Sequence, residues 1–235
     1  IADAALVKKP KPDPEIFEET EFDYEILLTR MREQAFLNAG IRIILRDERG
    51  EEIREDELCY EGGISTFVEH LNESRHNDVL HDKGIYMKGE KDSSIAEVAI
   101  QYNTGYQETI VTFANNMNTI EGGMHETGFK SALTKVINDY SRKKGILKDS
   151  DKNLSGEDVR EGICAIVSVK LENAQFESQT KAKLGNSEMR TLVDNIVSVK
   201  LAEFFEENPA IAKTICEKSL SAAVAREAAR KARES

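Results

Sequence analysis

Three strands follow one another closely in the middle of the sequence, and this spacing limits the possible folds most strongly. We predict strands near residues 84–88, 96–102 and 108–114. In the second strand, apolar residues at even positions alternate with polar Glu97 and Gln101, which indicates one buried face and one solvated face. Thr104-Gly105 supplies a short turn to the third strand. Short turns favour antiparallel pairing of consecutive strands over alternating βαβ units.

Helical and strand patterns surround this central group. The apolar, partly β-branched run Ile163–Lys170 is typical of a buried strand. Apolar spacing predicts a helix over 24–37, two strands between 41 and 60, and a short helix from Gly63. A long helix near 127–144 carries Phe129, Leu133, Val136, Ile137 and Tyr140 on one side. The pattern predicts an α+β fold with a mainly antiparallel sheet packed with helices.

The chain ends in a long helical pattern. Asn208 is a suitable cap and Pro209 is suited to the first helical position. Nothing breaks the pattern from Pro209 to Arg233, so a continuous helix would extend about 37 Å. Residues 222–232 are rich in alanine and charge, with little to pack on. We therefore expect a helix that projects beyond its own domain as a connector.

Charge argues against a dedicated nucleic-acid-binding protein. The net charge is −11, whereas neutralising phosphates requires a concentrated basic surface. Two basic clusters occur, at residues 142–148 and 226–233, and we interpret them as solvated helix faces. A transient contact with DNA stays open as a minority interpretation.

Other features bear on compartment and metal binding. The apolar runs are far too short to cross a membrane, and no signal segment opens the chain. The three cysteines form no CxxC pair, which indicates reduced thiols in a cytoplasmic protein. His70, His76 and His81 fit no metal-binding spacing, so we expect no metal site and interpret this region as a solvated loop.

The sequence lacks the usual motifs for binding phosphates. It contains no GxxxxGK[ST] loop and no GxGxxG after a strand. Gly122-Gly123 is interpreted as a tight turn, and the acids Glu157, Asp158 and Glu161 as helix-start residues after Ser155. We expect that this chain alone does not turn over ATP.

One polar stretch, QFESQTKAKLGNSEMR at residues 175–190, lies between the apolar strand and a helix that Asn186 or Ser187 can cap. The helix would bury Met189, Leu192, Val193 and Ile196. The stretch carries Lys181 and Lys183. Spacing alone favours a solvated loop with ordinary surface lysines, although a mobile loop between rigid elements could also present a cation to a ligand.

Several motifs occur together in a specific order. They are YEGG at Tyr60–Gly63, NNMNTIEGGMHETGF at Asn115–Phe129, SGEDVREGICAIVSVK at Ser155–Lys170, and QTKAKLGNSE from Gln179. In these motifs the chain closely resembles the B subunits of bacterial DNA gyrase, from about Pro12 to its end. The matching segment is the transducer, which joins the ATPase domain to the DNA-cleaving part.

This resemblance adds expectations about the fold. It implies a ribosomal-protein-like two-layer transducer domain over residues 12–207 and a C-terminal connector helix over residues 208–235. It also implies a left-handed βαβ crossover, against the usual right-handed rule. Residues 1–11 correspond to nothing that we can assign, and we treat them as an uncertain remnant or artificial junction.

The resemblance also implies a function for the lysine stretch. Lys181 would contact the γ-phosphate of ATP as a catalytic group, and Gln179 would support that contact. ATP and the ligand for Mg²⁺ would belong to a separate N-terminal ATPase domain. Further partners would be the C-terminal DNA-cleavage region, the gyrase A subunit and duplex DNA. Lys183 has no assigned role and is interpreted as a surface residue.

Three alternatives remain. The transducer of topoisomerase IV, in its ATPase subunit, shares the architecture. A stand-alone nucleic-acid-binding module would bind duplex DNA in a salt-dependent way. A small-molecule kinase is disfavoured, because the glycine- and serine-rich phosphate loop that it needs is missing.

Overall fold

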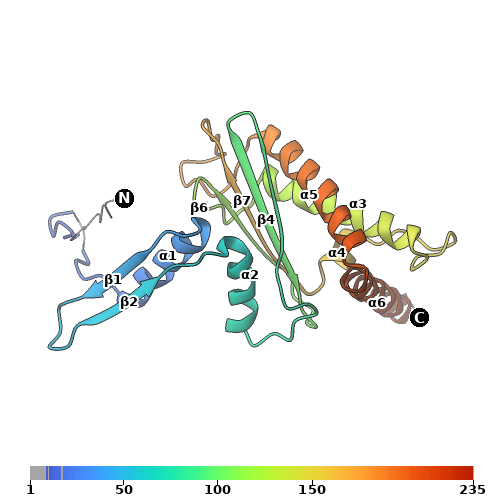
Figure 1. The fold of residues 1–235 in the computed structure, drawn as a ribbon, viewed down its shortest axis with the longest axis horizontal. Coiled ribbons are helices and arrows are strands. Elements are labelled where there is room, and N and C mark those ends of the chain that lie inside the picture. The colour runs from blue at the N-terminus through green and yellow to red at the C-terminus, as the bar shows by residue number, and fades with distance from the viewer. Residues whose placement is uncertain (1–8, 10, 17, 235) are drawn as a thin grey trace.

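The computed structural model describes residues 9, 11–16 and 18–234, so most of the segment 1–11 lies outside the described residues. The helices are α1 (Tyr24–Leu37), α2 (Gly63–Ser74), α3 (Met124–Lys143), α4 (Gly156–Arg160), α5 (Ser187–Glu207) and α6 (Pro209–Glu234). The strands are β1 (Ile43–Asp47), β2 (Arg54–Leu58), β3 (Ile85–Lys91), β4 (Ser94–Tyr102), β5 (Thr109–Ala114), β6 (Met117–Asn118) and β7 (Ile163–Lys170). These elements form the expected α+β fold (Figure 1).

The main sheet has the strand order β3-β4-β7-β5-β6. Strand β7 pairs antiparallel with β4 and parallel with β5. The expectation that consecutive strands pair was therefore wrong for β4 and β5, because β7 lies between them. All residues from Ile163 to Val169 are buried, so this strand is more stable at the centre of the sheet than at an edge. The parallel pair β5 and β7 is connected through α3, and the left hand of this crossover stays a prediction.

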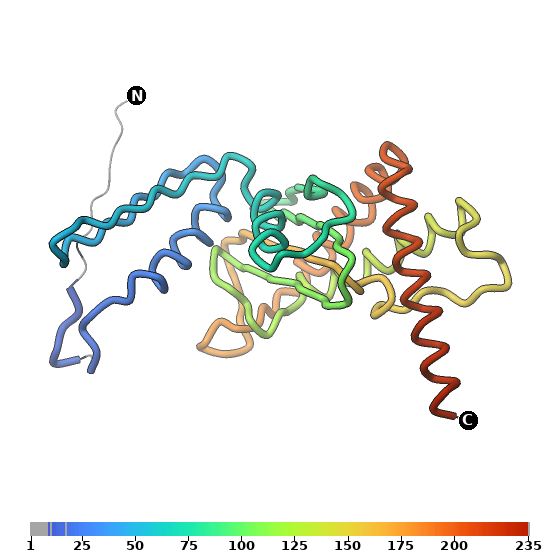
Figure 2. Tube along the Cα trace, turned by 90° about the horizontal axis from the view of Figure 1, so that it is seen from below, coloured from blue at the N-terminus to red at the C-terminus, as the bar shows by residue number. Residues whose placement is uncertain are grey.

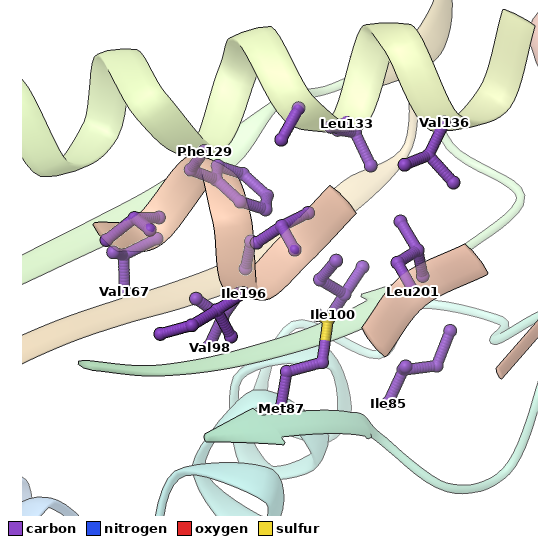
Figure 3. Packing of buried hydrophobic residues seen from close by; sticks show 14 of the residues in the cluster. Ile85, Met87, Val98, Ile100, Phe129, Leu133, Val136, Val167, Ile196 and Leu201 are labelled. Carbon is purple, nitrogen blue, oxygen red and sulfur yellow. The ribbon is translucent and has the colours of Figure 1, made fainter. Parts of the chain in front are cut away.

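Helices cover both faces of the sheet (Figure 1). On one face, α3 and α5 pack against the even-numbered residues of β4. Figure 3 shows Phe129 and Leu133 of α3 facing Val98 and Ile100 across Ile196. On the other face, α2 contributes Ile64, Phe67 and Val68 to a second cluster with Ala99 and Ile166.

The predicted solvated face of β4 was therefore incorrect. Gln101 is 2% exposed, and its polar groups are satisfied inside the protein rather than by water. Its Oε1 accepts from Asn72 Nδ2 at 2.9 Å, and its Nε2 donates to the carbonyl of His81 at 3.0 Å. A buried polar side chain of this kind mimics the period-two pattern of a half-exposed strand.

Local signals place the helix ends well. Helix α1 has the predicted bounds, and the Asp23 side chain accepts from Ile26 N at its start. Helix α4 begins with a reciprocal capping box between Ser155 and Asp158. Helix α3 begins at Met124 rather than at Thr127, directly after a tight glycine turn.

Helix α1 and strands β1 and β2 form an arm beside the main sheet (Figures 1 and 2). The arm has its own small core, which includes Tyr24, Leu28 and Leu58. Phe36 at the end of α1 stacks on Tyr60 and on Phe67 of α2, with ring centroids 3.8 and 4.6 Å apart. These aromatic contacts connect the arm to the second cluster under the sheet.

Helix α6 is continuous, as predicted, and its first half packs on the core through Ala212, Ile215 and Cys216. Packing continues further than expected. Ala222 is buried, and Arg226 makes two 2.9 Å hydrogen bonds to the carboxylate of Asp158. The C-terminal part of α6 extends away from the body (Figure 2).

None of the described helices is long and apolar enough to span a membrane. The three cysteines are free; Cys164 and Cys216 are buried, whereas Cys59 is exposed.

Asp158 has two roles, since it caps α4 and holds α6. Burial alone would raise the pKa of Asp158, but hydrogen bonds from Arg226 and Ser155 outweigh burial and lower it.

We predict that Asp158→Ala lowers the free energy of unfolding by about 2 kcal/mol, because it removes both the cap and the ion pair. Arg230→Ala is the control. Among the described residues, Arg230 pairs with Glu227 and Glu234 of its own helix and with no other element, so its loss should leave the midpoint of urea denaturation close to that of the parent.

A buried histidine makes stability depend on pH. His125 in the first turn of α3 is fully buried, with Nε2 3.0 Å from Thr119 Oγ1 and no partner for Nδ1 among the described residues. Burial lowers the pKa of His125 to about 4. The unfolded chain therefore binds a proton at higher pH than the folded chain does, and stability falls as pH drops below about 6.5.

We predict that this histidine removes about 2 kcal/mol of stability between pH 7 and pH 5. Burial also lowers the pKa of His70 and His81, so the parent must be compared with His125→Gln. The variant should lose less stability than the parent over the same pH range in urea titrations. Equal losses would show that His125 is not the group responsible.

Candidate functional site

Residues Gln175–Gly185, termed here the lysine hairpin, form a short antiparallel excursion between β7 and α5. Gly185 N donates to Gln175 O at 2.7 Å, and Glu177 N donates to Lys183 O at 3.0 Å. At the tip, Lys181 N donates to Ser178 O at 3.1 Å and closes a turn. The stretch predicted to be a flexible loop is thus a hairpin with its own backbone hydrogen bonds.

The lysine hairpin lies against the turn that precedes α3. Leu184 N donates to Gly122 O at 3.1 Å, and Met124 N donates to Leu184 O at 3.0 Å. Gly123 has φ +141°, and a Cβ there would lie 2.4 Å from Leu184 O. The tight turn at Gly122-Gly123 was predicted. The structure also shows why glycine is needed at Gly123: its backbone lies so close to that of Leu184 that a side chain would not fit.

The two lysines of the hairpin have different surroundings. Lys183 forms a 3.0 Å ion pair with Glu177 on the opposite strand of the hairpin. Lys181 is exposed at the tip, has φ +55°, and has no side-chain partner in the described part of the chain. A positive φ is uncommon for a residue with a side chain. The structure therefore distinguishes a lysine held by a carboxylate from one available to a ligand.

Gln179 also lies at the exposed tip, two residues before Lys181. Ser178 and Thr180 share a hydroxyl–hydroxyl hydrogen bond of 2.5 Å within this turn. The turn therefore brings both predicted site residues, Gln179 and Lys181, to the same end of the hairpin, although their side chains share no hydrogen bond within the described residues.

Asn186 follows the hairpin and occupies the N-cap position of α5. The sequence offered Asn186 or Ser187 as the cap; Asn186 takes the position, but its side chain forms no cap hydrogen bond. Its Oδ1 instead accepts from Gln175 N at 2.6 Å. Sequence reasoning missed this role, since the residue type and position suit a cap equally well.

A shallow pocket of about 290 Å³ separates the hairpin from α3. Its charged lining includes Glu126, Lys130, Glu177 and Lys183, which are paired as Lys130–Glu126 and Lys183–Glu177 at 2.7 and 3.0 Å. Lys181 does not line it. Both lysines that line this pocket are paired with carboxylates, whereas Lys181 lies outside it.

The basic clusters are largely neutralised within the chain. Lys143 and Lys144 both contact Glu206, at 2.6 and 3.0 Å. Arg142 donates to Asn153 Oδ1 and to backbone carbonyls. In the second cluster, Arg226 binds Asp158. These contacts reduce the basic surface available for nucleic acid.

His81 is buried, contrary to the expectation of a solvated loop. Its Nε2 accepts from Tyr102 N at 3.0 Å, so Nδ1 carries the proton and donates to Lys83 O at 2.8 Å. Within the described residues, no three side chains of His, Cys, Asp or Glu are grouped to hold a metal ion. His81 therefore has a structural role.

The sequence of this chain is similar to those of known DNA gyrase proteins. A family profile described as DNA gyrase B matches residues 63–235. The DNA gyrase B protein of Clostridium acetobutylicum is 56% identical over 225 residues, which cover 95% of this chain and 35% of the relative. The Bacillus mycoides protein of the same name is 55% identical over 95% of this chain and 55% of the relative. The chain thus spans about a third to a half of the length of these relatives.

The fold is also similar to solved structures of type II topoisomerase subunits. The 43K ATPase domain of Thermus thermophilus gyrase B, in complex with an aminocoumarin, superposes with a TM-score of 0.84 at 42% identity. The match covers 95% of this chain and 59% of that one. The topoisomerase IV ATP-binding domain of Francisella tularensis, at 21% identity and a TM-score of 0.73, shares the fold. With the profile match over most of the chain and close relatives over 95% of it, the chain belongs to the DNA gyrase B family.

Proposed function

We propose that this chain is the transducer of a gyrase B protein, which couples ATP binding and hydrolysis in an adjacent domain to DNA strand passage and supercoiling. The chain matches only part of the Thermus ATPase fragment and contains no phosphate-binding glycine motif of its own. Both facts support an ATP site located mainly outside this chain. The fragment alone is accordingly expected to be inactive.

The exposed Lys181 at the tip of an anchored hairpin, with no side-chain partner among the described residues, is the observation that carries this proposal. Lys181 would enter the ATP site of the adjacent domain and contact the γ-phosphate, with Gln179 supporting the contact. A cation in such a desolvated site stabilises charge on the transferring phosphoryl group far more than it does in water.

The same contact would report the state of the nucleotide. Once the γ-phosphate leaves, Lys181 loses its partner, and the hairpin is free to move. The hairpin is bonded to the start of α3 through Leu184 and leads directly into α5. Movement of the hairpin would therefore reach α3 and α5, which pack on the same face of the sheet.

Several partners follow from this proposal. ATP and Mg²⁺ would bind in the N-terminal ATPase domain, which would also supply the metal ligand. The transducer domain, residues 12–207, would continue into the connector helix, residues 208–235, toward the DNA-cleavage region. The assembled enzyme would include the gyrase A protein and duplex DNA, and would act in the cytoplasm.

Two alternatives are less well supported. Identities of 51–56% to gyrase B proteins favour gyrase over topoisomerase IV. A stand-alone nucleic-acid-binding module is disfavoured by the net charge of −11 and by the ion pairs of the basic clusters.

We predict that Lys181→Ala removes most ATP turnover, by about 100-fold, because it deletes the charge that stabilises the transferring phosphoryl group. Nucleotide affinity should change little. The experiment joins this chain to a gyrase B ATPase domain and measures steady-state turnover together with binding of a non-hydrolysable ATP analogue.

Lys183→Ala is the matched control, since it removes a lysine of the same hairpin whose charge is already paired with Glu177. It should retain most of the turnover. Unchanged turnover in Lys181→Ala would overturn the role of this lysine. The chain without the ATPase domain should show no turnover above background.

A further inference from the structure

Asn186 has an unusual pattern of hydrogen bonds for a residue at the start of a helix. Asparagine at an N-cap normally accepts from a backbone N–H in the first turn of its own helix. The Asn186 side chain makes no such bond, although the residue is only 3% exposed. Its Oδ1 accepts from Gln175 N at 2.6 Å, and its Nδ2 donates to Asn173 O at 3.0 Å and to Glu188 Oε1 at 2.7 Å.

These bonds close the base of the lysine hairpin. Asn173 and Gln175 lie where the chain enters the hairpin, and Asn186 lies where it leaves. The amide thus joins the two strands beside the backbone bond from Gly185 N to Gln175 O. Because both ends of the amide are occupied and nearly free of solvent, its orientation is well defined.

The base determines where the tip can lie. Leu184 and Ala182 fix the strand that leaves the tip against the segment before α3, Ala182 through its carbonyl, which accepts from Glu121 N at 2.9 Å. The strand that enters the tip is held by Asn186 and by the bonds across the hairpin, and residues 178–181 are exposed. A change of angle at the base would move Lys181 relative to any ligand that it contacts. Misplacement of a catalytic group by about 1 Å can cost about 100-fold in rate.

We propose that Asn186 is a positioning residue that sets the direction of the lysine hairpin and thereby places Lys181 for its contact with the γ-phosphate. This inference rests on the proposed function of Lys181. Asn186 itself touches no nucleotide and acts through the hairpin.

The variant Asn186→Asp separates positioning from capping. Aspartate accepts from Gln175 N and is as good an N-cap residue as asparagine, but it cannot donate to Asn173 O or Glu188. In the chain joined to a gyrase B ATPase domain, we expect kcat to fall about tenfold, with the KM for ATP within about twofold. The thermal unfolding midpoint should also fall, because the new carboxylate would face Asn173 O and Glu188 Oε1 with no proton to donate. The loss of kcat is therefore judged against a control variant that is also destabilised.

Asn208→Ala is the matched control at the other end of α5. The Asn208 side chain donates to Phe204 O within that helix, so the variant should lower the unfolding midpoint and leave kcat unchanged. A loss of turnover in Asn208→Ala equal to that in Asn186→Asp would overturn the inference, because the effect would then follow the stability of α5.

A double variant tests whether Asn186 acts through Lys181. If it does, Lys181→Ala with Asn186→Asp should be no slower than Lys181→Ala alone. If the losses of turnover in the two single variants add in the double variant, the inference is overturned. Normal turnover in Asn186→Asp, when Lys181→Ala is inactive, would also overturn it. Full activity in Lys181→Ala would instead contradict the proposed function, and the two failures are thereby distinguished.

Discussion

The burial of β7 at the centre of the main sheet is the constraint on which the other elements depend. Its backbone is paired on both sides, antiparallel to β4 and parallel to β5, and its side chains contribute to the clusters on both faces. A parallel neighbour requires a crossover connection, which α3 provides. The chain leaving β7 consequently emerges beside the start of α3, and there it forms the lysine hairpin.

The hairpin combines a rigid base with an exposed tip. The close approach of Gly123 to Leu184 and the side chain of Asn186 hold its base. Its tip presents Lys181 to solvent, while Lys183 is neutralised by Glu177. Such an arrangement suits contact with a separate domain, because the base fixes where the hairpin leaves the fold while Lys181 at the tip stays accessible.

The charge distribution favours internal contacts over a nucleic-acid-binding surface. The protein is acidic overall, and most arginines and lysines in its two basic clusters are bound to carboxylates or carbonyls of the same chain. One of these contacts, Arg226 with Asp158, joins α6 to α4. The charges of these clusters therefore stabilise the packing of helices more than they provide a surface for phosphates.

Sequence alone determined the features that arise from neighbouring residues. The bounds of α1, the capping box at Ser155 and the continuous helix from Pro209 follow from hydrogen bonds within a few residues. Only the tertiary structure decided the insertion of β7 between β4 and β5, the burial of Gln101 and the use of Asn186 at the hairpin base. Each of these depends on partners brought together by folding, and the residue type by itself is compatible with more than one partner. The two hairpin lysines differ for the same reason, since only Lys183 lies opposite a carboxylate.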